Sequence, residues 1–251
     1  MKKICNLLLQ YGVITWILVL GIWEALSILS DPEIFPGPVA TVQGALEVID
    51  DGSLFYFIGV SLSRVLTGWI LGSLIGVPLG VLMGRIRILR LLVEPFLHFI
   101  RFIPALAFIT LFLLWFGIGE VAKIVLITYA TLFIVILNTM TGAMSLSEDM
   151  LRSVRSMGAS ESQILRYVVF PAIIPYIFTG LRLAMGASFM AIIGAEMVAA
   201  NEGIGFLIWN SRLYFKTDWI FVGLFSLGLM GFFTDRILSF LGHRFLWKYG
   251  V

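Results

Sequence analysis

Three ionisable side chains, Arg101, Arg182 and Glu196, lie inside long apolar stretches of the sequence. On insertion scales a charged group at the centre of a membrane helix costs about 2.5–3.5 kcal/mol, so each should face protein or a wet cavity rather than lipid. Such groups either pair structurally or line the path of a transported species. We treat the three as candidates for a translocation path, with structural pairing as the alternative.

Other charged residues are grouped near the ends of apolar stretches. Glu94, His98 and Arg101 follow an i, i+4, i+7 spacing and therefore share one helical face. Asp235 and Arg236 are neighbours near the end of the last stretch, where we expect a structural role.

Enzyme chemistry finds no support in the motifs. There is no HExxH motif, no GxxxxGK[ST] phosphate loop and no nucleophile–base arrangement, and the only histidines are His98 and His243. The sequence predicts no catalytic residue, no metal site and no cofactor bound by this chain.

The elements that carry these residues follow from composition. Of 251 residues, 60% are hydrophobic and 13% are charged, and the mean hydropathy is +1.02. In soluble domains about 45–50% of residues are apolar and about 25% are charged. The net charge of +2 is too small to indicate a surface that binds nucleic acid, and a single cysteine, Cys5, excludes a disulfide framework. The chain is predicted to be an all-α polytopic membrane protein.

Six stretches reach the length of about 20 residues that a membrane-crossing helix requires. They are residues 11–29, 66–83, 95–116, 121–144, 172–200 and 219–241. The stretches are continuously apolar rather than alternating, which excludes barrel strands.

Basic residues predict the orientation, because loops on the cytoplasmic side are enriched in them. Four lie on one side, Arg64, Lys123, Arg212 and Lys216, and three lie within spans, Arg101, Arg182 and Arg236. The other ten share the opposite side: Lys2, Lys3, Arg85, Arg87, Arg90, Arg152, Arg155, Arg166, Arg244 and Lys248. Both termini are therefore expected in the cytoplasm, and the acidic loop 30–51 outside, with a short helix at 39–49 along the outer membrane surface.

Small residues predict close helix packing. Five glycines recur every four residues in the second span: Gly68, Gly72, Gly76, Gly80 and Gly84. The fifth span has a similar stripe of alanines: Ala187, Ala191, Ala195 and Ala199. Such stripes let helix backbones approach closely in lipid, either within one bundle or at a subunit interface.

Segment 145–171 has the pattern of two amphipathic helices joined at a glycine. Met150, Leu151, Val154 and Met157 share one face of the first helix. Capping boxes are predicted to start the two helices, at Ser145-Leu-Ser-Glu148 and Ser160-Glu-Ser-Gln163. Gly158 suits the left-handed position that ends the first helix, and Pro171 should stop the second. The pattern favours a docking elbow for a soluble partner over a helix lying on lipid headgroups.

The same segment carries a resemblance. Arg152-Ser-Val-Arg-Ser-Met-Gly158-Ala-Ser, followed by Val168-Val-Phe-Pro171, resembles the EAA loop of permease subunits in type I ABC importers, with a divergent opening triplet. Further passages resemble the nitrate/taurine/sulfonate branch of that family. They are Phe-Pro-Gly-Pro at 35–38, Leu-Trp-Phe-Gly-Ile-Gly at 114–119, Gly-Leu-Arg at 180–182, Ala-Glu-Met at 195–197 and Gly-Ile-Gly-Phe at 203–206.

The resemblance implies a MetI-like transmembrane fold of six helices in the inner membrane of a prokaryote. It implies a first helix at 1–30, an outer loop at 31–57, a permease core at 58–242 and a cytoplasmic tail at 243–251. The implied partners are a permease homodimer, two copies of an ATPase subunit that uses ATP and Mg²⁺, and an extracytoplasmic solute-binding protein. Coupling to the ATPase would use residues of the elbow: Glu148, Arg152, Arg155, Gly158, Ala159 and Ser160.

The substrate stays open at this point. A small organic anion such as a sulfonate or taurine fits best, and nitrate or bicarbonate, a pyrimidine vitamin precursor and riboflavin are alternatives within the same family. An ion-coupled secondary transporter, with Arg182 and Glu196 as relay groups, is the alternative from another class.

Overall fold

Helices make up nearly all of the chain in the computed structural model, which describes residues 13–31 and 33–249. Lys2, Lys3, Cys5 and most of the predicted N-terminal tail lie outside the described residues. The elements are α2 Val13–Leu29, α3 Pro38–Asp50, α4 Ser53–Arg85, α5 Arg87–Ile100, η1 Ala105–Phe108, α6 Ile109–Phe116, α7 Glu120–Met144, α8 Glu148–Ser156, α9 Glu161–Ile164, η2 Leu165–Val169, α10 Phe170–Ala199, α11 Ile204–Leu213, α12 Thr217–Leu246 and η3 Trp247–Tyr249.

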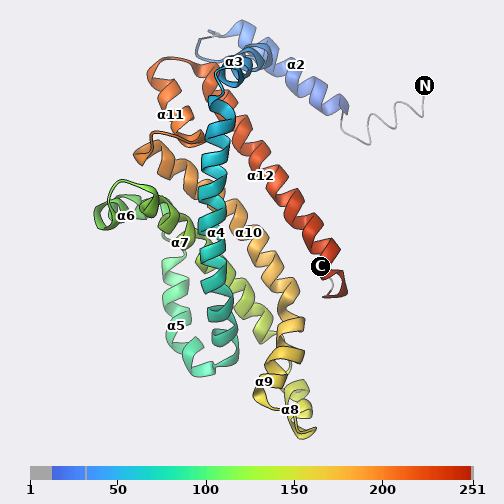
Figure 1. Ribbon diagram of the computed structural model, residues 1–251. Helices are drawn as coiled ribbons and strands as arrows, with labels where there is room; N and C mark the ends of the chain where they lie inside the picture. The colour runs from blue at the N-terminus through green and yellow to red at the C-terminus, as the bar shows by residue number, and fades with distance from the viewer. Residues whose placement is uncertain (1–12, 32, 250–251) are drawn as a thin grey trace, which may run out of the picture.

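Four of these segments are long and apolar enough to cross a membrane: α4, α7, the stretch Glu161–Ala199 and α12. They run in one general direction, with α2 and α3 at one end and the elbow helices α8 and α9 at the other (Figure 1). Each predicted span corresponds to helical structure, and the described part of the first span, α2, is a shorter apolar helix of 17 residues.

The third predicted span is not one straight helix, and this is a correction. α5 and the η1–α6 segment meet at a bend of 88°. Pro104 has no N–H to continue a helix from α5, and it restricts the preceding residue to an extended conformation. The residues between Ile100 and Ala105 therefore form turns, and α6 projects sideways from the bundle (Figure 1).

The glycine stripe of α4 packs against α7 within the same chain. A Cβ atom built on Gly72 would lie 2.6 Å from the Thr131 Cβ and 2.8 Å from the backbone oxygen of Thr128. Gly68, Gly76, Gly80 and Gly84 meet α7 in the same way, so the spacing of four in the sequence follows the line of contact. The glycine stripe therefore serves helix packing within one bundle, the first of the two alternatives, rather than a subunit interface.

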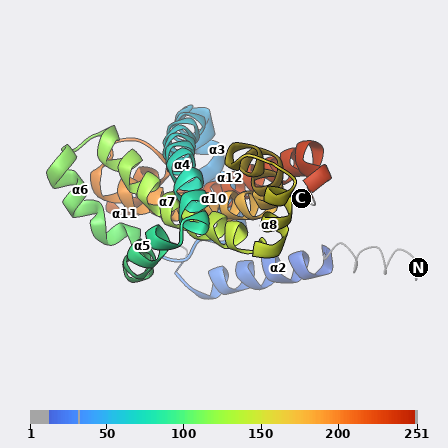
Figure 2. The same cartoon turned by 90° about the horizontal axis from the view of Figure 1, so that it is seen from below.

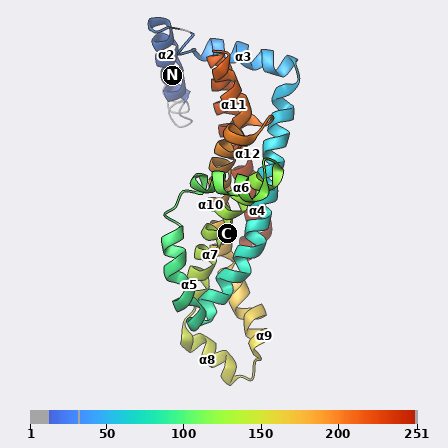
Figure 3. The same cartoon turned by 90° about the vertical axis from the view of Figure 1, so that its left-hand side faces the viewer.

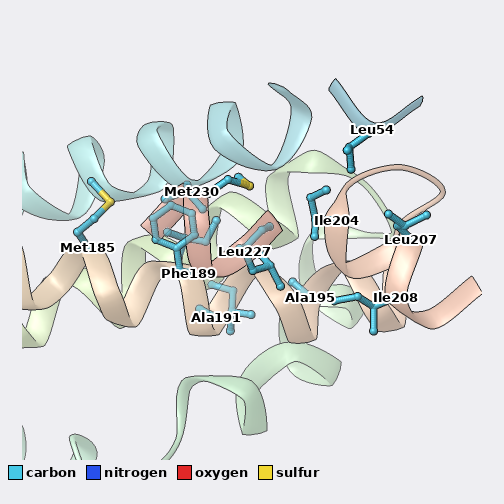
Figure 4. Close-up of a cluster of buried hydrophobic side chains, with 14 of the residues drawn as sticks. Leu54, Met185, Phe189, Ala191, Ala195, Ile204, Leu207, Ile208, Leu227 and Met230 are labelled. Carbon is cyan, nitrogen blue, oxygen red and sulfur yellow. The ribbon is translucent and has the colours of Figure 1, made fainter. Parts of the chain in front are cut away.

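The main core lies toward the end of the bundle that carries α3. Side chains of α10, α11 and α12 meet there, including Phe189, Ile208 and Met230, and Leu54 of α4 closes the cluster (Figure 4). α3 lies across this end of the bundle (Figure 3), in the manner expected of a helix on the membrane surface. Seen from below, α2 lies to one side of the other helices (Figure 2).

Candidate functional site

The elbow at the far end from α3 is two short helices joined through a left-handed glycine. Ser147 caps α8 by accepting a hydrogen bond from the Met150 N–H at 3.2 Å. The predicted cap at Ser145 is wrong, because that hydroxyl donates to the Gly142 carbonyl within the end of α7. Gly158 follows α8 with φ +87°, which confirms the predicted left-handed position.

The second helix begins as predicted but does not stop at Pro171. Ser160 and Gln163 form a reciprocal capping box at the start of α9. The helix then continues through one π turn, Leu165–Val169, directly into α10. A π turn changes the hydrogen-bond partners in the segment before Pro171, whose ring nitrogen donates no hydrogen bond, so the proline is accommodated without a break. The second helix of the elbow and the fifth span are thus one continuous helical segment, Glu161–Ala199.

The elbow is fixed to the ends of α4 and α7 by an apolar cluster. Leu151 of α8, Ile164 of α9 and Ile173 of α10 are at most 2% exposed and pack with Val81 and Ala143. Burying one such side chain contributes about 1.5–3 kcal/mol, so these contacts hold the elbow against the bundle.

The exposed surface of the elbow carries both polar and apolar side chains, since Met150 is 46% and Met157 78% exposed. Glu148, Arg152 and Ser160 are exposed, whereas Ala159 is partly buried against the apolar cluster. Arg155 donates to Glu161 at 2.6 Å across the glycine. This carboxylate raises the pKa of Arg155, because it stabilises the charged guanidinium.

A second feature is a cleft of about 360 Å³ between the break of the third span, α7 and α10. Arg101 and Leu106 line it from the break, Tyr129 from α7, and Ala187 and Met190 from α10. Arg101 is exposed and lies over the Phe102 ring at 5.1 Å. The described residues give it no ion-pair partner, so it brings an uncompensated positive charge to the cleft.

The other two predicted path residues do not line this cleft. Arg182 makes a two-pronged ion pair with Asp235 of α12, at 2.8 and 2.7 Å. Its positive charge is therefore offset within the bundle. Glu196 is 1% exposed and belongs to a buried network. Both residues show the structural pairing that was the alternative to a path role.

Arg64 is the centre of that network, which sequence reasoning missed. We expected Arg64 on the outer side, just before the second span, but it lies within α4 and is only 2% exposed. The guanidinium donates two hydrogen bonds to the Glu120 carboxylate, both at 2.6 Å, and one to the Glu196 carboxylate at 2.8 Å. It also donates to the Glu202 carboxylate at 3.2 Å and to the Glu202 backbone carbonyl at 2.8 Å. The available indication was a lone arginine directly before the second apolar stretch, but the three acids come from distant parts of the sequence.

The network joins four elements at the α3 end of the molecule. Ser61 of α4 donates to Glu196 at 2.8 Å and accepts from the Ile204 N–H at 2.9 Å. The Gly205 N–H donates to the same carboxylate at 2.9 Å. Ser61, Arg64 and Glu196 are buried, whereas the side chain of Glu120 is 53% exposed. Together these groups tie α4, α7, α10 and the start of α11 to one another, and their hydrogen bonds fix the relative positions of the four elements.

Comparison with known proteins gives consistent matches. The family model described as "Binding-protein-dependent transport system inner membrane component" matches residues 76–246. A probable ABC transporter permease of Brucella melitensis is 34% identical over 94% of this chain and 96% of its own length. The taurine transport system permease of Escherichia coli is 30% identical over 92% of this chain and 86% of its own length.

A solved structure matches the fold. In the inward-facing MetNI methionine ABC transporter, one chain superimposes with a TM-score of 0.59 at 20% identity, covering 74% of this chain and 95% of that one. This similarity shows the fold of a type I importer's membrane domain.

Proposed function

The chain belongs to the binding-protein-dependent transport system inner membrane components, and from this premise we propose that it carries a small organic anion inward by alternating access. It is a multi-pass ABC importer permease of the inner membrane. The solute class, the motion and the residues that mediate them are the proposal. Sulfonates are the favoured class, since a taurine permease is among the relatives.

The elbow is the observation that carries the proposal. It exposes polar side chains together with Met150 and Met157 for a partner, whereas Leu151 and Ile164 are buried against α4, α7 and α10. A soluble ATPase that binds the exposed face and moves would therefore displace the bundle rather than a loop. ATP and Mg²⁺ would be used by that ATPase, with two copies serving a permease homodimer, and a solute-binding protein would deliver the anion at the α3 end.

Replacing Gly158 tests the coupling. Proline fixes φ near −65° and removes the N–H, whereas Gly158 has φ +87° and donates to the Arg155 carbonyl at 2.9 Å. We expect Gly158→Pro to leave the protein inserted and to uncouple ATP hydrolysis from uptake of the solute in membrane vesicles.

Gly52 provides a matched control at the opposite end of the molecule. It has φ +77°, donates to the Ile49 carbonyl at 3.0 Å, and like Gly158 has no atom within 4 Å of a built Cβ. Gly52→Pro should cost similar strain and keep uptake coupled to ATP hydrolysis. Equal uncoupling by both variants would reject the elbow as the coupling element. Uptake that survives ATP depletion would instead favour an ion-coupled transporter.

A further inference from the structure

The turn between α11 and α12 holds a phenylalanine in a backbone conformation that does not suit it. α11 ends in a Schellman motif, in which the Phe215 N–H donates to the Arg212 carbonyl at 3.3 Å. The Lys216 N–H completes the motif by donating to the Ser211 carbonyl at 3.0 Å. This places Phe215 in the left-handed region with φ +55°, where glycine is the usual residue. Among the described residues it is the one non-glycine residue with a positive φ.

The Phe215 ring gains nothing inside the chain that would offset this strain. Phe215 is 84% exposed, and the neighbouring Tyr214 is 71% exposed. In the described structure neither ring belongs to a buried hydrophobic cluster. Glycine would close the same turn without the steric cost. A strained and exposed aromatic residue therefore indicates a contact outside the chain.

Two contacts hold the turn in place directly after Phe215. The Lys216 ammonium pairs with Glu47 of α3 at 3.4 Å, and the Thr217 hydroxyl donates to the Glu33 carbonyl. The turn is thereby fixed to the α3 end of the molecule, opposite the elbow (Figure 1, Figure 3). The aromatic ring is presented from a rigid base rather than from a loose loop.

This arrangement favours a folded protein over lipid as the partner. A fluid headgroup layer accommodates an aromatic ring in any orientation, so neither strain nor bracing brings an advantage there. A folded partner gains from a ring that is already held in place, because less freedom is lost on binding. Aromatic residues and arginine are enriched in protein interfaces. Arg212 lies beside the turn, over the Trp209 ring at 4.4 Å, and has no ion-pair partner among the described residues.

We propose that the α11–α12 turn is a docking anchor for the solute-binding protein of this importer, and that the Phe215 ring enters an apolar pocket of that protein. The proposal rests on the permease function above and deepens it, since it names the residue that engages the partner. The family to which the chain belongs depends on such a binding protein. The unpaired charge of Arg212 fits a carboxylate at the rim of the pocket.

Two measurements on the same variants test the proposal: affinity for the binding protein, and thermal stability without it. The probe is the purified, solute-loaded binding protein that supports ATP-driven uptake through this permease. The permease is used in complex with its ATPase, in nanodiscs. Phe215→Gly should weaken binding about tenfold or more, because the anchor is lost. The same variant should melt about 2 °C higher, because glycine adopts φ +55° without strain.

Two further variants at this position separate the ring from the strain. Phe215→Ala removes the ring but keeps a Cβ in the left-handed region, so it should lose affinity without gaining stability. Phe215→Tyr keeps both the ring and the strain, so its affinity and its melting temperature should stay close to those of the wild type.

Phe102→Gly is the matched control. Phe102 is 77% exposed and lies in the turn after α5, where φ is not positive. Glycine there removes an exposed phenylalanine without relieving strain, so the complex should melt about 2 °C lower. Its affinity for the binding protein should not change.

The outcomes separate this proposal from lipid anchoring and from the permease function. Unchanged affinity in Phe215→Gly, an equal loss in Phe102→Gly, or a lower melting temperature in Phe215→Gly would each overturn the anchor. A loss of affinity that is present in nanodiscs and absent in detergent micelles would assign the ring to lipid and overturn it as well. In all these cases ATP-driven uptake by the wild-type complex would leave the permease function standing. Failure of the wild-type chain to assemble with an ATPase, which is seen before any variant is compared, would refute the permease proposal itself.

Discussion

The seam between α4 and α7 permits a test in which two similar substitutions should have opposite effects. Gly72 and Gly59 both lie within α4, so alanine improves the helix propensity of either by about 0.8–1.0 kcal/mol. At Gly59 no atom lies within 4 Å of the new Cβ. At Gly72 the Cβ would lie 2.6 Å from the Thr131 Cβ and 2.8 Å from a backbone oxygen, which no rotamer change relieves.

The magnitude follows from these distances. Overpacking a well-packed core costs about 1–3 kcal/mol, which exceeds or cancels the gain in propensity. We therefore expect Gly72→Ala to be destabilised by up to about 2 kcal/mol, and Gly59→Ala to be stabilised by up to about 1 kcal/mol. The difference between the variants should be about 1–3 kcal/mol.

Unfolding in mixed detergent, followed by tryptophan fluorescence, measures this difference. Trp69 lies on α4 close to Gly72 in sequence, and its indole donates to the Leu181 carbonyl of α10 at 2.9 Å, so its emission reports on the separation of these helices. If Gly72→Ala unfolds at the same or a higher detergent fraction than Gly59→Ala, close approach of the backbones is not the role of the stripe.

Two further predictions concern charge. Arg64→Gln leaves the buried Glu196 carboxylate without its cation, so the protein should lose about 3–5 kcal/mol of stability in the same unfolding assay. Adding Glu196→Gln to this variant should recover part of the lost stability. A double variant as unstable as Arg64→Gln alone would contradict the pairing. Hydrogen bonds from Ser53 lower the pKa of Asp51 below its ordinary value of 3.8. The Asp51 carboxylate therefore stabilises the first turn of α4 at pH 3.8 and above. This stabilisation is lost as the pH falls through the lower pKa of the folded state. Hydrogen exchange of that turn at acid pH measures this, and Asp51→Asn should abolish the dependence.

Local chemistry explains why the elbow could be predicted from the sequence. Ser160 and Gln163 cap their own helix, and Gly158 adopts a conformation that other residues rarely take. Each of these signals involves residues only a few positions apart, so the sequence contains both partners. The spacing of the glycine stripe likewise predicted a close approach.

The partners in long-range contacts could not be predicted. Nothing near Arg64 in the sequence indicates Glu120, Glu196 and Glu202, which lie 56, 132 and 138 positions away. The continuous helix through Pro171 was missed for a different reason. Proline usually ends a helix, and no pattern of residue types in the sequence predicts the π turn that accommodates Pro171 here.

The continuity of that helix links the elbow to the cleft. From Glu161 to Ala199 the chain is one helical segment, with the elbow at its start and Ala187 and Met190 of the cleft wall near its far end. At about 1.5 Å per residue the elbow lies roughly 40 Å from the cleft, too far for a direct effect. Because Ile164 at the elbow and Ile173 beyond it are buried against α4 and α7, a displaced elbow should tilt this helix about that cluster. A tilt moves Ala187 and Met190 relative to Tyr129 on α7, so the partner that moves the elbow would open or close the cleft.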